Sequence, residues 1–151
     1  MIKVISIGKI KEKYLRDAVL EYSKRISKYT KLEFIELSDY DFNNKKIVLE
    51  KEKENIMKYI NEKDYIITME ILGNEMSSEE FAKKIDETFI KYPSITFIIG
   101  GSYGLHDDIK KKSNLSLSFS KLTFPHQLFK VLLLEQIYRS YKIIKNESYH
   151  K

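Results

Sequence analysis

Three glycines, at positions 100, 101 and 104, directly follow an apolar run in the stretch "FIIGGSYGLHDDI". Glycines at the end of a buried strand allow a tight turn, and they also allow a ligand to approach the main chain. The spacing G-G-x-x-G matches neither the G-x-G-x-x-G pattern of dinucleotide-binding proteins nor the G-K-[ST] ending of a P-loop. A tight turn would explain one glycine, whereas three within five residues favour a ligand site.

Two other segments follow predicted strands and would lie at the same edge of a parallel sheet. They are "MEILGNEMSSEE" (69–80) and "FSKLTFPHQ" (119–127). Glu70 could simply be a solvated strand end, and Thr123 could merely cap the helix that follows. Together the three segments describe a pocket with few ionisable side chains, which suits a neutral adenine bound by main-chain amides and carbonyls better than a triphosphate.

Metal and thiol chemistry are not expected. The chain has no cysteine, and its histidines at positions 106, 126 and 150 do not have the spacing of metal ligands. We expect His106 to be exposed and His126 to be a packing or capping residue at the start of a helix.

Strands and helices alternate along the chain, which predicts one α/β domain over residues 1–151 with a parallel sheet flanked by helices. Apolar runs and alternation predict strands, and helical spacing predicts amphipathic helices. Ser77 and Glu80 have the spacing of a capping box, and Pro125 fits the first turn of the last helix. The predicted strands are 2–7, 32–37, 65–71, 94–99 and 115–119, and the predicted helices are 11–28, 45–61, 77–90, 105–112 and 125–145.

Composition limits the partners and the location. The 27 basic and 22 acidic residues make the chain mildly basic, which suits a polyanionic partner without requiring one. No window resembles a membrane span or a secretory signal, so we expect a cytoplasmic protein.

The last predicted helix is apolar on nearly every side, from Leu128 to Tyr138. Such a helix has to be buried all round, and a small sheet covers only one of its faces. We therefore expect a homodimer in which a second copy covers the helix; a fully internal helix in a monomer is the alternative.

The sequence resembles the RlmH family, which are SPOUT-class methyltransferases that act on ribosomal RNA. The resemblance extends over essentially the whole chain, and it is most specific in the paired glycine and "SKLTFPHQ" loops followed by a Tyr-His-basic terminus. The segments that carry it are "IKVISIGKIKEKYL", "TMEILGNEMSSEEFA", "IGGSYGLHDDI", "LSLSFSKLTFPHQLFKVLLLEQIYRSYKI" and "NESYHK".

The resemblance implies methyl transfer from S-adenosylmethionine to N3 of a pseudouridine in a hairpin of 23S rRNA, the large-subunit rRNA, in the assembled ribosome. It implies an α/β knot in which the C-terminal part is threaded through a loop, and homodimers that pack through the C-terminal helix. The knot contradicts the general rule that chains do not thread loops, so it rests on the resemblance alone.

Residue roles also follow from the resemblance. The glycines would let the main chain pass close beside the cofactor, and the tail would close the active site, with Tyr149, His150 and Arg139 as the catalytic candidates. Arg139, Lys142 and Lys151 would contact RNA phosphates, although Arg139 could instead form a structural ion pair. The cofactor-binding candidates are Met69, Gly100, Gly101, Phe119, Ser120, Lys121, Leu122, Thr123 and Phe124.

Two other functions remain open at this point. The chain could be a non-enzymatic ribosome- or RNA-binding module of the same fold, which would bind RNA without the cofactor. It could also be a dimer that senses a small ligand, which would bind S-adenosylmethionine without any dependence on ribosomes.

Overall fold

A computed structural model describes residues 1–151 as a five-stranded parallel sheet with five helices. Every predicted strand and helix is present, so the α/β fold class is confirmed. The largest differences are in the third strand, which ends at residue 75 instead of 71, and in the second helix, which ends at residue 57 instead of 61. The elements are β1 Ile2–Ile7, α1 Lys13–Ile26, β2 Leu32–Leu37, α2 Lys45–Met57, β3 Asp64–Glu75, α3 Ser78–Lys91, β4 Ser94–Ile99, α4 Asp107–Lys112, β5 Leu115–Ser118 and α5 His126–Ile144.

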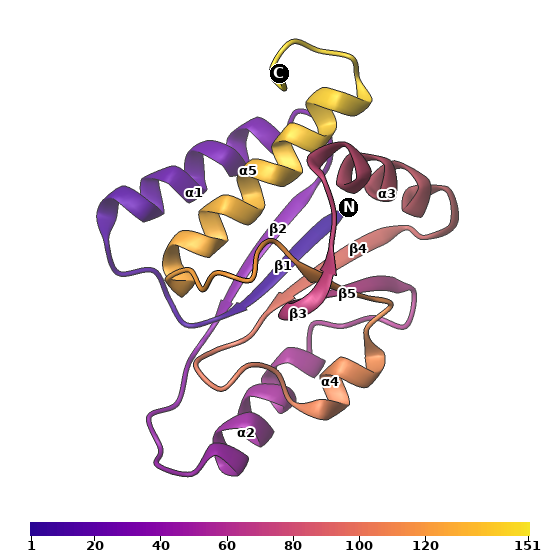
Figure 1. The fold of residues 1–151 in the computed structure, drawn as a ribbon. Helices are drawn as coiled ribbons and strands as arrows, with labels where there is room; N and C mark the ends of the chain where they lie inside the picture. Colours follow the sequence, from indigo (N-terminus) through magenta and orange to yellow (C-terminus); the bar gives the residue numbers. More distant parts are fainter.

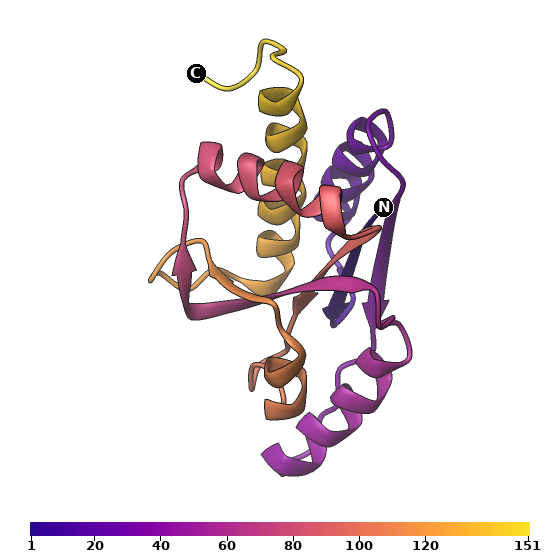
Figure 2. The ribbon, with the colours of Figure 1, turned by 90° about the vertical axis from the view of Figure 1, so that its right-hand side faces the viewer.

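The strands lie in the order β2-β1-β4-β3-β5 between two layers of helices. Helices α1, α3 and α5 cover one face, and the shorter α2 and α4 cover the other (Figures 1 and 2). Each face has its own hydrophobic core, since the side chains of a strand alternate between the two faces. Ile2 and Val4 of β1 belong to the larger core under α1, α3 and α5, whereas Ile5 and Ile7 belong to the core under α2 and α4.

Helix α3 begins with the predicted capping box. The Ser77 hydroxyl accepts a hydrogen bond from the Glu80 amide, and the Glu80 carboxylate accepts one from the Ser77 amide. Helix α5 begins at His126, so Pro125 is the residue before the helix and not part of its first turn as predicted. Its carbonyl still accepts the first intrahelical bond, from the Phe129 amide.

Strand β3 is irregular at the edge of the sheet where the glycine loop lies. Met69 and Asn74 both pair with Leu117 of β5, so residues 70–73 bulge out of the ladder between them. Gly73 permits this bulge, because a Cβ atom there would lie 2.9 Å or less from main-chain carbons of β5. The bulge moves Glu70, Ile71 and Leu72 away from the sheet.

Residues 119–125 cross the carboxyl ends of the strands. The chain leaves β5 at one edge of the sheet, and α5 then packs between α1 and α3 on the face opposite α4 (Figure 1). The three segments that the sequence assigned to a pocket therefore meet at one place. The threading of the C-terminal part through a loop stays a prediction.

The sequence analysis expected the sheet to cover only one face of α5, but α1 and α3 of the same chain cover it as well. The sheet, α1 and α3 together enclose Leu133, Leu134 and Ile137. An outer stripe remains half-buried, and Leu128 at its start is 39% exposed. The homodimer that would cover this stripe stays a prediction. None of the helices combines the length and the apolar character that a bilayer span would need.

Candidate active site

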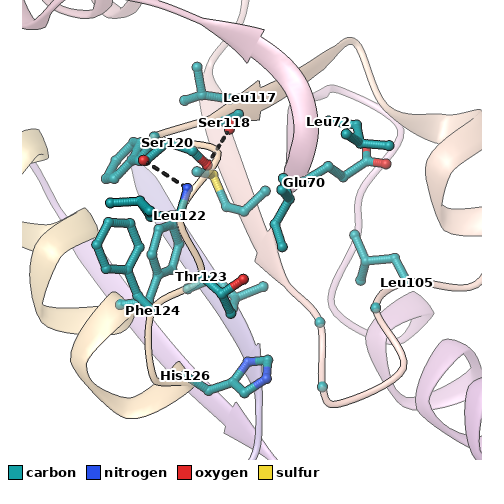
Figure 3. A pocket seen from close by; sticks show the side chains of 18 of the residues that line it. Glu70, Leu72, Leu105, Leu117, Ser118, Ser120, Leu122, Thr123, Phe124 and His126 are labelled. Carbon is teal, nitrogen blue, oxygen red and sulfur yellow. Dashed lines mark hydrogen bonds between the residues drawn. The ribbon is translucent and has the colours of Figure 1, made fainter.

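A cavity of about 380 Å³ lies at the carboxyl ends of β3, β4 and β5 (Figure 3). Leu72 and Leu105 lie on one side of it, and Leu122 and Thr123 lie on the other. Eight of the nine predicted cofactor-binding residues line the cavity; the exception, Lys121, has an exposed side chain that points elsewhere. The eight are Met69, Gly100, Gly101, Phe119, Ser120, Leu122, Thr123 and Phe124.

The segment 119–124 offers unpaired main-chain groups to this cavity. The Ser120 hydroxyl accepts from the Leu122 amide, and the Ser120 carbonyl accepts from the Ser118 hydroxyl (Figure 3). The other amides from Ser120 to Phe124 donate to no group of the protein. Main-chain amides that no protein group engages are free to donate to a ligand in the cavity. The ring nitrogens of the adenine of S-adenosylmethionine are acceptors of the kind that such amides could bind.

The glycines have a structural role that the sequence had not indicated. A Cβ atom at Gly100 would lie 2.5 Å from the Gly104 carbonyl oxygen, and one at Gly101 would lie 3.0 Å from Ile7 and 3.2 Å from the Glu52 carboxylate. Gly104 has open space around it, but its φ of +78° favours glycine. Contacts within the protein therefore disfavour a side chain at Gly100 and Gly101, and the φ of Gly104 favours glycine there. Gly100 and Gly101 also line the cavity, and their contact with a cofactor stays a prediction.

Glu52 of α2 is a buried carboxyl group directly behind Gly101. Its exposed fraction is only 4%, and no cation or hydrogen-bond donor offsets this burial. Burial, together with the nearby Asp39 carboxylate, raises the pKa of Glu52 to about 7. Below about pH 7 the neutral acid is therefore the favoured form in the folded protein, and ionisation acts against the packing of the glycine loop.

We expect Glu52→Gln to remove a pH dependence of stability. Because the pKa is raised on folding, the native protein loses stability as pH rises from about 4.5 to 7, by about 2–3 kcal/mol. The variant should not show this loss, so it should be the more stable protein at pH 8. Urea unfolding at pH 5 and pH 8 measures the difference, with the exposed neighbour Glu54→Gln as control. Equal pH slopes for the native protein and Glu52→Gln would contradict the expectation.

His106 connects the glycine loop to α2, and the expectation that it is exposed was wrong. Its side chain is 21% exposed. The Nδ1 atom accepts from the Asp108 amide at the start of α4, and Nε2 lies 3.0 Å from the Glu50 carboxylate. Lys53 lies between Glu50 and Asp108 and pairs with both. This polar cluster fixes the end of the glycine loop against α2.

Three ionisable residues line the cavity: Glu70 and His126, which lie in the segments that the sequence assigned to it, and Lys110, which the sequence had not assigned. The Glu70 carboxylate accepts from the Thr68 hydroxyl at 2.7 Å, and it lies 3.8 Å from the Lys110 ammonium. The position of Glu70 depends on the bulge in β3. Gly73 is the one residue in the sequence that could have indicated this bulge. No group of three or more histidine and acidic side chains is arranged to hold a metal ion.

The tail folds back onto α3 and α5 and brings the three catalytic candidates together. Asn146 turns the chain with a φ of +54°, and the Glu147 amide then donates to the Lys142 carbonyl. Asparagine tolerates this left-handed conformation better than most residues. The Arg139 guanidinium lies 4.8 Å from the Tyr149 ring centroid and 2.9 Å from His150 Nδ1.

Glu135 organises this group, although the sequence did not single it out. One of its oxygens accepts from Nε and Nη2 of Arg139 and from the Tyr149 hydroxyl. Its hydrogen bonds raise the pKa of Arg139, while burial and the Glu135 carboxylate raise the pKa of Tyr149 to about 12. Arg139 remains a cation and Tyr149 remains a neutral hydrogen-bond donor.

Two of the three residues predicted to contact RNA phosphates form ion pairs within the protein. Lys142 pairs with Glu147 at 3.0 Å, and this bond and the one to the Tyr29 hydroxyl raise its pKa. Arg139 makes the structural ion pair with Glu135 that its sequence position left open. Lys151 is exposed. RNA binding by these three residues stays a prediction.

The tail group lies far from the cavity along α5. Ten positions along α5 separate Phe129, the last residue of the helix that lines the cavity, from Arg139, and this spacing corresponds to about 15 Å of helix. No residue of the tail lines the cavity. The structure therefore assembles two groups of candidate residues, one at each end of α5.

Comparisons with known proteins identify the family of this chain. The family described as "Predicted SPOUT methyltransferase" matches residues 1–150. The chain is 53% identical to the Ribosomal RNA large subunit methyltransferase H of Caldicellulosiruptor saccharolyticus over all of both chains, and 48% identical to that of Clostridium acetobutylicum over 99% of both. A solved structure described as a probable methylase family protein from Haemophilus influenzae shares the fold, with a TM-score of 0.60, 14% identity and coverage of 99% of this chain and 70% of that chain. The chain therefore belongs to the SPOUT methyltransferases, and within them to the RlmH family of ribosomal RNA large subunit methyltransferases.

Proposed function

We propose that this protein is a cytoplasmic enzyme that methylates N3 of a pseudouridine in a hairpin of 23S rRNA, using S-adenosylmethionine and acting on assembled ribosomes. The observation that carries the proposal is the cavity, in which unpaired amides of the segment 119–124 border an apolar space between three loops. The family membership supports the coarser statement that the substrate is large-subunit rRNA.

Bound S-adenosylmethionine would supply an electrophilic methyl group, and its sulfonium would leave as a neutral thioether. The residues of this chain then have two tasks. The cavity orients the cofactor, so that the N3 lone pair can attack the methyl carbon in line with the carbon–sulfur bond. A base must also take the N3 proton, because the neutral imide nitrogen is a poor nucleophile.

His150 is our candidate for the base, but its hydrogen bonds require the tail to move first. Its Nδ1 atom faces the Arg139 guanidinium, which can only donate, and its Nε2 atom lies 2.6 Å from the Glu79 carboxylate, which accepts. Both ring nitrogens are therefore engaged. We infer that His150 separates from Arg139 when ribosomal RNA binds, that the tail moves toward the cavity, and that the free Nδ1 then accepts the proton.

We also propose that the protein is a homodimer that packs through the outer stripe of α5. Leu128, Val131 and Tyr138 lie on this stripe and remain partly exposed in the single chain. Covering them with a second copy would remove apolar surface from water. Light scattering of the purified protein measures the mass, and a monomer at micromolar concentration would contradict this part of the proposal.

Methyl transfer to ribosomes tests the main proposal. We expect the purified protein to transfer labelled methyl groups to ribosomes that lack the modification, and digestion to nucleosides followed by mass spectrometry should identify N3-methylpseudouridine. Naked rRNA and isolated subunits should be poorer substrates than assembled ribosomes. Ribosome binding without transfer would favour the non-enzymatic module, and cofactor binding without any activity or affinity toward ribosomes would favour a ligand sensor.

Calorimetry with S-adenosylmethionine tests the cavity separately. Thr123→Trp should fill the cavity and abolish binding, whereas Lys121→Trp, at an exposed position next to it, should bind as the native protein does. Substitution of Gly101 would be less informative, because a larger side chain meets Ile7 and Glu52 before it reaches the cofactor. Equal binding by both tryptophan variants would place the cofactor elsewhere.

A further inference from the structure

A second cavity, of about 270 Å³, lies between the cofactor cavity and the tail group. It shares Leu117, Phe119 and Phe124 with the first cavity. Its other end is formed by Ser78 of α3 and Gln136 of α5. Along α5, Phe129 in the first cavity and Gln136 in the second are about 10 Å apart, and Arg139 follows one turn later.

The walls of this cavity suit a flat, neutral ring. None of its lining residues has an ionisable side chain. Phe81 and Phe119 form a T-shaped pair in the wall, with ring centroids 6.3 Å apart, and Phe124 adds a third ring. A phosphate or the charged methionine part of the cofactor would lose its hydration here without gaining a counter-charge. An aromatic wall of this kind instead favours a nucleobase that has left its stack.

The polar end of the cavity offers one directed hydrogen-bond donor. The Gln136 carbonyl oxygen accepts from the Ser78 hydroxyl at 2.8 Å, and its Nε2 atom donates to the Glu135 carboxylate at 3.0 Å. These two bonds fix the orientation of the amide. One hydrogen on Nε2 remains unused. The same Glu135 side chain holds Arg139 and Tyr149, so this donor has a fixed position relative to the tail group.

We propose that the second cavity binds the target pyrimidine base, and that Gln136 donates a hydrogen bond to a base carbonyl adjacent to the reacting nitrogen. This inference rests on the proposed function. Loss of the N3 proton places negative charge on the carbonyl oxygens of the imide, and the free Gln136 N–H stabilises that charge. The new bond joins N3 to the methyl carbon, and the proton goes to the base described above.

Steady-state methylation of ribosomes by two variants tests the base site. Gln136→Leu should lower kcat about 100-fold, because it removes the donor to the developing charge. Ser78→Phe should block the cavity and strongly lower the rate, whereas Ser27→Phe, on the exposed end of α1, should keep it. Calorimetry should give an unchanged Kd for S-adenosylmethionine in all three proteins, and their melting temperatures show that they are folded.

The other outcomes have distinct meanings. Full rates for Gln136→Leu and Ser78→Phe would overturn the inference while leaving the proposed function intact. Weaker S-adenosylmethionine binding by both variants would overturn it by assigning the second cavity to the cofactor. A change from dimer to monomer in both would overturn it by assigning the cavity to a second copy of the chain. If the native protein transfers no methyl group to any ribosome, the proposed function itself fails.

Discussion

Deletion of Tyr149 to Lys151 should lower methyl transfer by about 10²–10⁴-fold, the usual effect of losing a general base, while S-adenosylmethionine binds with an unchanged Kd. The reason is the separation of the two groups of residues: no tail residue lines the cavity proposed for the cofactor, and Arg139 of the tail group lies about 15 Å further along α5 than Phe129. Single-turnover methylation of ribosomes and calorimetry with the cofactor measure the two effects on the same protein.

Point variants distinguish two roles of His150: proton acceptance in the reaction, and the contacts that hold the tail against α3 and α5. His150→Gln keeps a polar side chain that can bond to Arg139 or Glu79, but it removes the proton acceptor, so it should be nearly as inactive as the deletion. Glu79→Gln only weakens the contact that holds His150 in place, and it should retain most of the activity. Ser148→Ala, at an exposed position of the tail that carries no proposed role, is the matched control. A His150→Gln protein with the native rate and native pH profile would show that His150 is not the base.

Replacement of Lys130 by methionine should destabilise the protein by about 3 kcal/mol. Lys130 has no exposed surface, although it carries a charge in the middle of the apolar face of α5. Its ammonium donates to the Gly8 carbonyl at 2.6 Å and to the Glu36 carboxylate at 2.9 Å. Methionine would fill the space, but it would leave both acceptors without this partner. The Glu36 side chain is 26% exposed and can regain some hydration, which keeps the loss at the lower end for a buried pair.

Urea unfolding of Lys130→Met against the exposed control Lys121→Met measures this loss. The double variant with Glu36→Gln should recover part of the stability, because the unpaired carboxylate is then removed. Lys130 also ties the start of α5 to the ends of β1 and β2, so the variant should weaken cofactor binding by loosening the segment before α5. A stability within 0.5 kcal/mol of the control, the usual range for surface substitutions, would show that the pair is not required.

The local elements could be predicted because their determinants are local. The Ser77–Glu80 capping box places the start of α3, and the apolar run 94–99 forms β4 with the predicted ends. Helical spacing in 11–28 located α1 to within two residues at each end, since the apolar face repeats with the helical period. The third strand was predicted too short because its irregular second half is held by β5, which comes forty residues later.

The candidate site could be predicted only in part. The glycine loop and the segment 119–124 were identified from residue types, and the parallel sheet brings them together. A second reason for glycine at positions 100 and 101 was not foreseen, because the atoms beside their side-chain positions belong to Gly104, Ile7 and Glu52. His106 was placed in solvent, because its partner Glu50 lies on another helix. Nothing in the sequence indicated that Lys130 is buried, because its two partners are remote in the chain. They are Gly8, directly after β1, and Glu36 of β2.

The sequence by itself determined the alternation of strands and helices, the three loops of the cofactor cavity and, through its resemblance, the family. These properties depend on residue type and short-range spacing. The tertiary structure alone decided that Glu52 is a neutral buried acid, that Lys130 is a buried cation, and that Glu135 holds Arg139 and Tyr149 in one group. Burial and pairing of a charge depend on distances between residues that are remote in the chain, and those distances exist only after the layers have packed.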